Sequence, residues 1–240
     1  MPPQPLSRVC LNATVTIDPD TAIKAYPDLM LLVMSVIETW ARIDAHITTL
    51  LTTFLKADFL PVAAMMQALT GGEGKKAAIR AAATESLSKE NLDLFNAVMK
   101  VITPSRNRRN EFAHHFWAIS PQVPDALVLI DPKHIVRDDA IRRDYAVKST
   151  DITDMEQWEA GYKALPLSDT SHAFVYRKTD LAHEREQAKA CHGYVILLGV
   201  ALQFASLKDL GDQSAPVRQR LLEEPPIRLA LQQMTSGNAP

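Results

Sequence analysis

Apolar residues recur every three or four positions along much of the chain, which is the spacing of one face of an α-helix. The longest stripe lies in residues 28–55 and comprises Val33, Ile37, Trp40, Ile43, Ile47, Leu51 and Phe54. Similar patterns predict a second helix from about Pro61 to the Gly71–Gly72 pair, a third and more polar one over "KKAAIRAAATESL", and a fourth that Ser88 opens. The pattern therefore predicts a helical bundle.

The fourth helix is interrupted by a proline. Its predicted buried side consists of Leu94, Phe95, Val98, Val101 and Ile102. Pro104 follows this stripe, and it either kinks the helix or restarts it as a first-turn proline after an N-cap at Thr103. In both cases we expect residues 105–117 to continue as helix.

The pattern changes after Pro121. Three β-rich runs, "ALVLI", "DYAVKST" and "HAFVYRK", alternate with turn-forming segments and predict a small antiparallel sheet. A long helix is expected from about Thr179 to Lys208. The segment from Asp212 contains Pro216, Pro225 and Pro226 and predicts one or two short helices that fray at "TSGNAP".

These elements predict a mainly α protein with a small antiparallel β insert and a long C-terminal helix. We expect a loose N-terminal arm over residues 1–25, with a candidate strand at "ATVTI". A single domain follows over residues 26–208, with a helical core (26–117), a β insert (118–178) and a closing helix (179–208). Residues 209–240 are expected to form a flexible, proline-containing tail.

Composition narrows the class of protein. The chain has 240 residues, a hydrophobic content of 47% and a net charge of −2, so any contact with nucleic acid must come from a local basic patch. Cys10 and Cys191 are the two cysteines, which argues against a disulfide scaffold or a thiolate zinc site. The sequence has no secretory signal pattern, and its apolar runs are shorter than the ~20 residues of a membrane span. We expect a cytoplasmic protein without membrane contact.

The segment "SRNRRNEFAHHFW", residues 105–117, carries the candidate chemistry. On a continuous helix Arg109 shares the apolar arc of Phe112, Ala113 and Phe116, whereas Asn110 and His114 lie one turn apart on the face of Arg106. A guanidinium on an apolar face needs an anion, because losing the partner of a buried charge costs about 3–5 kcal/mol.

Asp44 lies on the apolar stripe of the first helix and is the expected partner of Arg109, whereas Glu38 should be solvated. An alternative is that this pair only fixes how two helices pack, and that His114 and His115 have no chemical role.

The run "RNEFAHHFW" resembles the motif of the HEPN superfamily, in which four to six residues separate an arginine from a histidine. Arg109, Asn110 and His114 occupy the motif positions, and "WARIDAHITTLL" looks like the tryptophan-and-acidic pattern of the family's first helix. The resemblance covers about residues 26–117. His115 departs from it, because many relatives have a small residue there.

The resemblance implies an HEPN-like helical bundle and a metal-independent endoribonuclease of the toxin or defence type, without a cofactor. Such an enzyme cleaves single-stranded RNA by attack of the 2′-hydroxyl. Histidine transfers protons and arginine binds phosphate. The family also implies a homodimer through the motif helix, and a possible antitoxin or nucleotidyltransferase partner.

The site predicted from the motif and its geometry has three parts. The catalytic residues are Arg109, Asn110 and His114. Asp44 and Trp117 support them, and Arg106 and Arg108 are expected to contact the RNA phosphate. An aromatic surplus also suggests a subunit interface, formed by Trp40, Phe54, Phe112, Phe116 and Trp117.

Two other functions stay open at this point. One is a catalytically inactive dimeric module that binds a partner protein or a nucleotide, and the other is an accessory subunit that recognises its target through the β insert. Competing sites are weak, because His183, Glu184 and His192 do not have HExxH spacing and "GGEGKK" lacks the Walker pattern. No metal site is expected.

Overall fold

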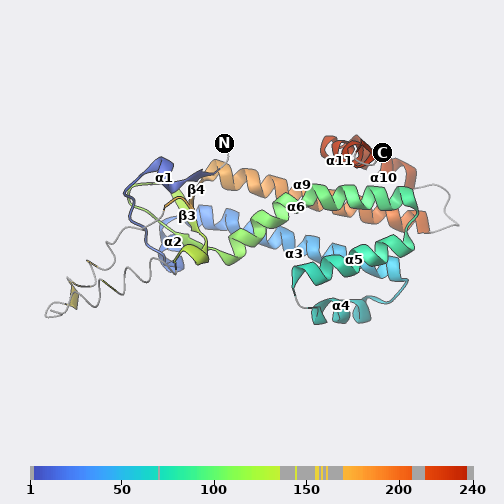
Figure 1. The fold of residues 1–240 in the computed structure, drawn as a ribbon, viewed down its shortest axis with the longest axis horizontal. Helices are drawn as coiled ribbons and strands as arrows, with labels where there is room; N and C mark the ends of the chain where they lie inside the picture. The colour runs from blue at the N-terminus through green and yellow to red at the C-terminus, as the bar shows by residue number, and fades with distance from the viewer. Residues whose placement is uncertain are drawn as a thin grey trace. The chain divides into compact units, whose positions relative to one another are not determined.

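The computed structural model describes residues 3–69, 71–135, 144, 155–156, 158, 161, 170–206 and 214–236. Over these residues the protein is mainly helical and has a small four-stranded antiparallel sheet (Figure 1). This agrees with the fold class that the hydrophobic pattern predicts.

Three long helices dominate the described chain: α3 (Pro27–Leu55), α6 (Lys89–His114) and α9 (Lys178–Ser206). Two shorter helices, α4 (Phe59–Ala68) and α5 (Gly72–Ser86), connect α3 to α6. Nearly all of the predicted stripe on α3 is buried, and Trp40, Ile43 and Leu51 are fully so. The three-and-four spacing of apolar residues therefore predicted this helix and its buried face correctly.

The sheet has the order β1-β4-β3-β2, and all pairings are antiparallel. Its strands are β1 (Gln4–Pro5), β2 (Phe116–Ala118), β3 (Ala126–Ile130) and β4 (Ala173–Arg177). Every residue of β3 is buried, as suits a central strand without a polar face. The runs "ALVLI" and "HAFVYRK" thus form strands as predicted, whereas "DYAVKST" lies outside the described residues except for Asp144.

The chain divides into two compact units. The first comprises residues 1–37 and 107–186 and contains the sheet, and the second comprises residues 38–106 and 187–240. The boundary crosses each of α3, α6 and α9. The limits predicted for a single domain, 26–208, remain a prediction.

The expectation that the motif helix runs to residue 117 is wrong. Helix α6 ends at His114, and Phe116–Ala118 pair with Ile130, Leu129 and Val128 of β3. Pairing with β3 buries Trp117 and Ala118, which favours the strand over a further helical turn. Phe116 and Ala113 are exposed, so the apolar arc predicted around Arg109 is also wrong beyond Phe112.

The N-terminal arm is more ordered than predicted. It contributes β1, α1 (Leu6–Val9) and α2 (Pro19–Ala25), and Leu6, Ala13 and Val15 are buried in the core of the sheet. The candidate strand "ATVTI" makes only an isolated bridge, between Thr16 and Ile119.

The predicted short helices of the tail are confirmed as α10 (Ser214–Glu223) and α11 (Pro225–Ser236). The flexibility predicted for this tail stays a prediction, and both helices make tertiary contacts. Leu221 and Ile227 are fully buried, and Arg218 contacts both Glu90, at 3.2 Å, and Asn91, at 3.0 Å.

Among the described helices, no single one combines the length and the apolarity needed to cross a membrane. The pair α3 and α4 meets the criteria of length and composition only when taken together, across a bend of 117°.

Candidate functional site

All five motif residues that sequence analysis placed on one helix lie on α6: Arg106, Arg108, Arg109, Asn110 and His114. Pro104 lies inside this helix and does not end it. Next to Pro104, the Thr103 hydroxyl donates a hydrogen bond to the Met99 carbonyl at 2.7 Å, which stabilises this turn of the helix. The helix is therefore continuous from the buried stripe to the motif.

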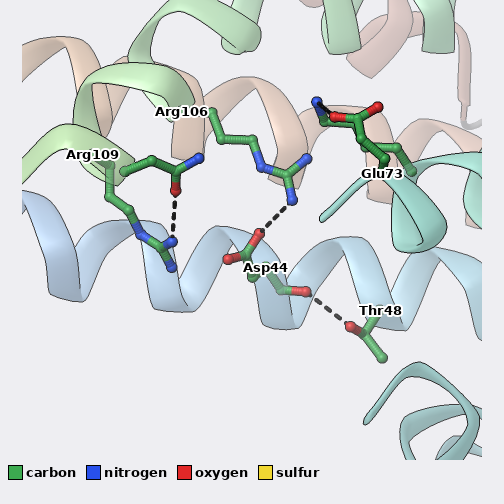
Figure 2. Close-up of polar contacts among 7 residues, drawn as sticks. Asp44, Thr48, Glu73, Arg106 and Arg109 are labelled. Carbon is green, nitrogen blue, oxygen red and sulfur yellow. Dashed lines mark hydrogen bonds and ion pairs between the residues drawn. The ribbon is translucent and has the colours of Figure 1, made fainter. Parts of the chain in front are cut away.

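Arg109 and Asn110 are joined by a hydrogen bond. The Arg109 Nη1 donates to Asn110 Oδ1 at 3.0 Å, and both side chains are half-buried (Figure 2). This contact leaves the amide NH2 of Asn110 as the part that can donate to a ligand. The structure thus brings together two of the three predicted catalytic residues.

His114 is the last residue of α6, and its side chain is exposed. The backbone after it is fixed, since the His115 N–H donates to the Glu111 carbonyl at 2.8 Å and Trp117 Nε1 donates to the Phe112 carbonyl at 3.1 Å. Trp117 therefore supports the end of the motif helix from its position in β2.

Arg108 lies in a dense polar cluster. Its guanidinium contacts Glu111 on the same helix, Glu184 on α9 at 3.4 Å and the Tyr176 hydroxyl at 2.9 Å. Burial raises the pKa of Tyr176 and of Glu184, and Arg108 partly offsets both shifts. Arg108 is predicted to contact RNA phosphate, but two carboxylates already compete for its charge.

Sequence reasoning did not find the contributions of Tyr176 and Glu184. Both lie more than 60 residues from Arg108, and only the pairing of β3 with β4 places Tyr176 beside Phe112 and Trp117, with ring centroids 5.2 and 5.8 Å apart. The one signal in the sequence was an acidic residue at the start of a long helix, which is too common to single out Glu184.

Asp44 lies in the second unit, where its carboxylate is 3.8 Å from Arg106 (Figure 2). Asp44 lies between Trp40 and Ile47 of the apolar stripe in the sequence, and its side chain is 39% exposed. Nearby, Trp40 Nε1 donates to Ser105 Oγ at 3.1 Å and joins α3 to α6. The pairing of Asp44 with Arg109 stays a prediction. Glu38 is solvated as predicted, and it pairs with Arg42.

A histidine cluster that the sequence did not reveal lies at one edge of the sheet. Phe116 pairs with Ile130, and Ile130 pairs with Ala173. His115 precedes Phe116, Asp131 follows Ile130 and His172 precedes Ala173, so all three lie at the same edge of the sheet. His134 stacks on His172 with ring centroids 3.7 Å apart. A backbone hydrogen bond from Lys133 lowers the pKa of Asp131, and the charges of His115 and His134 add to this.

Within the part of the chain that the structure describes, no group of three or more His, Cys, Asp or Glu side chains is arranged to hold a metal ion. The aromatic surplus predicted for a subunit interface is mostly absent, because Trp40, Phe54, Phe112 and Trp117 are buried within the chain and Phe116 alone of the five is exposed.

Comparisons of the chain with protein-family models, with curated proteins and with solved structures find no match.

Proposed function

We propose that the protein is a metal-independent endoribonuclease of the HEPN type, which cleaves single-stranded RNA. One observation supports this most directly. The Arg109 guanidinium holds the Asn110 amide at 3.0 Å, and His114 is exposed one turn further along the same face of α6. An arginine, an amide and an exposed imidazole on one helix are the groups that this chemistry uses.

The proposed roles follow from the chemistry of each side chain. His114 takes the proton from the 2′-hydroxyl or delivers one to the leaving 5′-oxygen, because imidazole exchanges protons near neutral pH. Arg109 stabilises the charge that builds on the phosphate oxygens, since its fork of donors stays cationic. The Asn110 amide, fixed by Arg109, orients the phosphate.

A base and an acid are both needed, and one histidine cannot fill both roles in the same step. We therefore propose a homodimer in which the motif helices of two chains provide two copies of His114. An antitoxin or a nucleotidyltransferase is the regulator that the family resemblance suggests.

The direct test is cleavage of single-stranded RNA by the purified protein in EDTA. We expect products that end in 2′,3′-cyclic phosphate. His114→Ala should lower the rate by about 100-fold or more, as expected for loss of a general acid or base. His183→Ala is the matched control, because His183 is an exposed histidine in the same unit outside the motif, and its rate should equal that of the wild type.

Cleavage that requires an added divalent metal would contradict the proposed mechanism. If the folded protein cleaves no RNA, the inactive binding module is the better description. Equal losses in His114→Ala and His183→Ala would point to a contaminating nuclease.

A further inference from the structure

The second unit contains a cavity of about 960 Å³ between α5 and α6, and all of its lining residues belong to these two helices. The helices form a hairpin, since only Leu87 and Ser88 separate them, so they run antiparallel. A volume of this size is typical of sites for small molecules. None of the residues predicted as catalytic lines this cavity.

Basic side chains line the cavity from both helices. Lys76 and Arg80 of α5 lie one turn apart, about 6 Å along the helix axis, and Lys100 and Arg106 of α6 complete the set. Glu73 is the one acidic residue among the lining side chains, so the cavity has a net positive charge. Such a surplus favours an anionic ligand.

Lys76 lies at the end of the hairpin away from the turn, and Arg80 lies one helical turn closer to the turn. Antiparallel packing places Glu73 and Lys76 at the same end as Arg106. Lys76 donates to the Glu73 carboxylate at 2.6 Å, and this hydrogen bond is the main cause that lowers the pKa of Glu73. The charges of Arg106 and Arg80 lower it further.

These cations are held in different ways. The Arg106 side chain is only 18% exposed and lies 3.8 Å from Asp44, and Lys100 donates to Gln233 of α11 at 2.9 Å. Arg80 is exposed, and among the described residues it makes no salt bridge. With Lys76 bound to Glu73, three of the four cations are thus pre-positioned, and Arg80 is the one most available to a ligand.

The remaining lining residues of the cavity are uncharged. Ile79, Phe95 and Ile102 are nearly fully buried and form an apolar floor. Thr84, which lies nearer the turn, and Asn96, which lies level with Arg80 along the hairpin, add neutral hydrogen-bonding groups. The cavity is therefore amphipathic, because cations, apolar side chains and neutral polar groups all line it.

We propose that this cavity binds a small organic phosphate. Its phosphate group would contact Lys76, Arg80 and Arg106, and its apolar body would lie on Ile79 and Phe95. This proposal does not depend on ribonuclease activity, because Arg109, Asn110 and His114 do not line the cavity. Arg106, which the sequence predicts as an RNA-phosphate contact, is the one residue that the two sites share.

Isothermal titration calorimetry of the full chain tests the proposal with three probes: 1-naphthyl phosphate, inorganic phosphate and 1-naphthol. We expect naphthyl phosphate to bind more tightly than either fragment, because only it engages both the cations and the apolar floor. Arg80→Gln should weaken its binding about tenfold, equivalent to about 1.4 kcal/mol. Thr103→Glu, which places a carboxylate on the cavity wall, should abolish it.

Lys75→Gln is the matched control, because Lys75 neighbours Lys76 on α5 but does not line the cavity. It should bind naphthyl phosphate as the wild type does, and circular dichroism should show all three variants folded. The proposal is overturned if the wild type binds no naphthyl phosphate, or if Arg80→Gln and Lys75→Gln weaken it equally. Binding of an oligouridylate without binding of naphthyl phosphate would also overturn it and would make the cavity a track for RNA.

Discussion

Arg106 and Arg108 lie two residues apart on α6, yet their surroundings differ in charge. Arg108 contacts two carboxylates and a tyrosine hydroxyl, so negative charge exceeds its own. Arg106 has one distant carboxylate and lines a cavity with three other cations and one acidic residue. Arg108, which carboxylates surround, therefore has a structural role, whereas Arg106, which lies among other cations, is available to bind an anion.

The largest effect should come from removing Arg108. Arg108→Ala leaves Glu184, which is 15% exposed, and the more exposed Glu111 without their shared cation. We expect the free energy of unfolding to fall by about 2–3 kcal/mol, less than the 3–5 kcal/mol of a fully buried pair because water reaches part of this cluster. Urea denaturation measures the change. A loss below 0.5 kcal/mol, on the scale of about 0–1 kcal/mol for a surface pair, would show that Arg108 is also free to bind.

Asp44→Ala should have a smaller effect on stability. Its carboxylate is 39% exposed and 3.8 Å from Arg106, so we expect a loss of about 1 kcal/mol or less in the same denaturation experiment. A loss of about 3–5 kcal/mol would instead indicate that Asp44 is the partner of a buried Arg109, as the sequence predicts.

The smallest effect should be a change in pH dependence. Burial raises the pKa of Glu184 above its ordinary 4.5, with Arg108 opposing the shift, so the folded protein holds this proton more tightly than the unfolded chain does. The stability from this proton is fully present below pH 4.5 and is lost as pH rises through the raised pKa.

Glu184→Gln removes this titration. The stability of the variant relative to the wild type should therefore increase as pH rises through the window above 4.5. Thermal melts of both proteins over a pH series measure the difference. A relative stability that falls over this window would show that the ion pair with Arg108, not burial, dominates at Glu184.

The sequence predicted the parts of the fold that local patterns determine. The stripe on α3, the start of α6 near Ser88 and the runs "ALVLI" and "HAFVYRK" each carry their own periodicity or β-propensity. The predicted end of α6 was wrong because β2 pairs with β3, and this long-range contact competes with continuation of the helix. The helices α10 and α11 pack through Leu221 and Ile227, whose burial a local pattern cannot reveal.

The sequence likewise predicted only those parts of the candidate site that lie on one element. Arg109, Asn110 and His114 share one helix, so their spacing alone placed them together. Glu184, Tyr176 and the cluster of His115, Asp131 and His172 depend on strand register and helix packing, which the spacing of residues along one element does not determine. The α5–α6 cavity likewise needs the hairpin geometry.

The division of the chain into units has a consequence for how the protein can be made. Each unit is assembled from two separate stretches, 1–37 with 107–186 and 38–106 with 187–240, so the polypeptide passes from one to the other three times. During synthesis the second unit lacks its final stretch until residues 187–240 have left the ribosome. Cutting the gene at any single point yields no fragment that contains one unit and nothing else, and an isolated half would expose surface that its missing stretch normally covers.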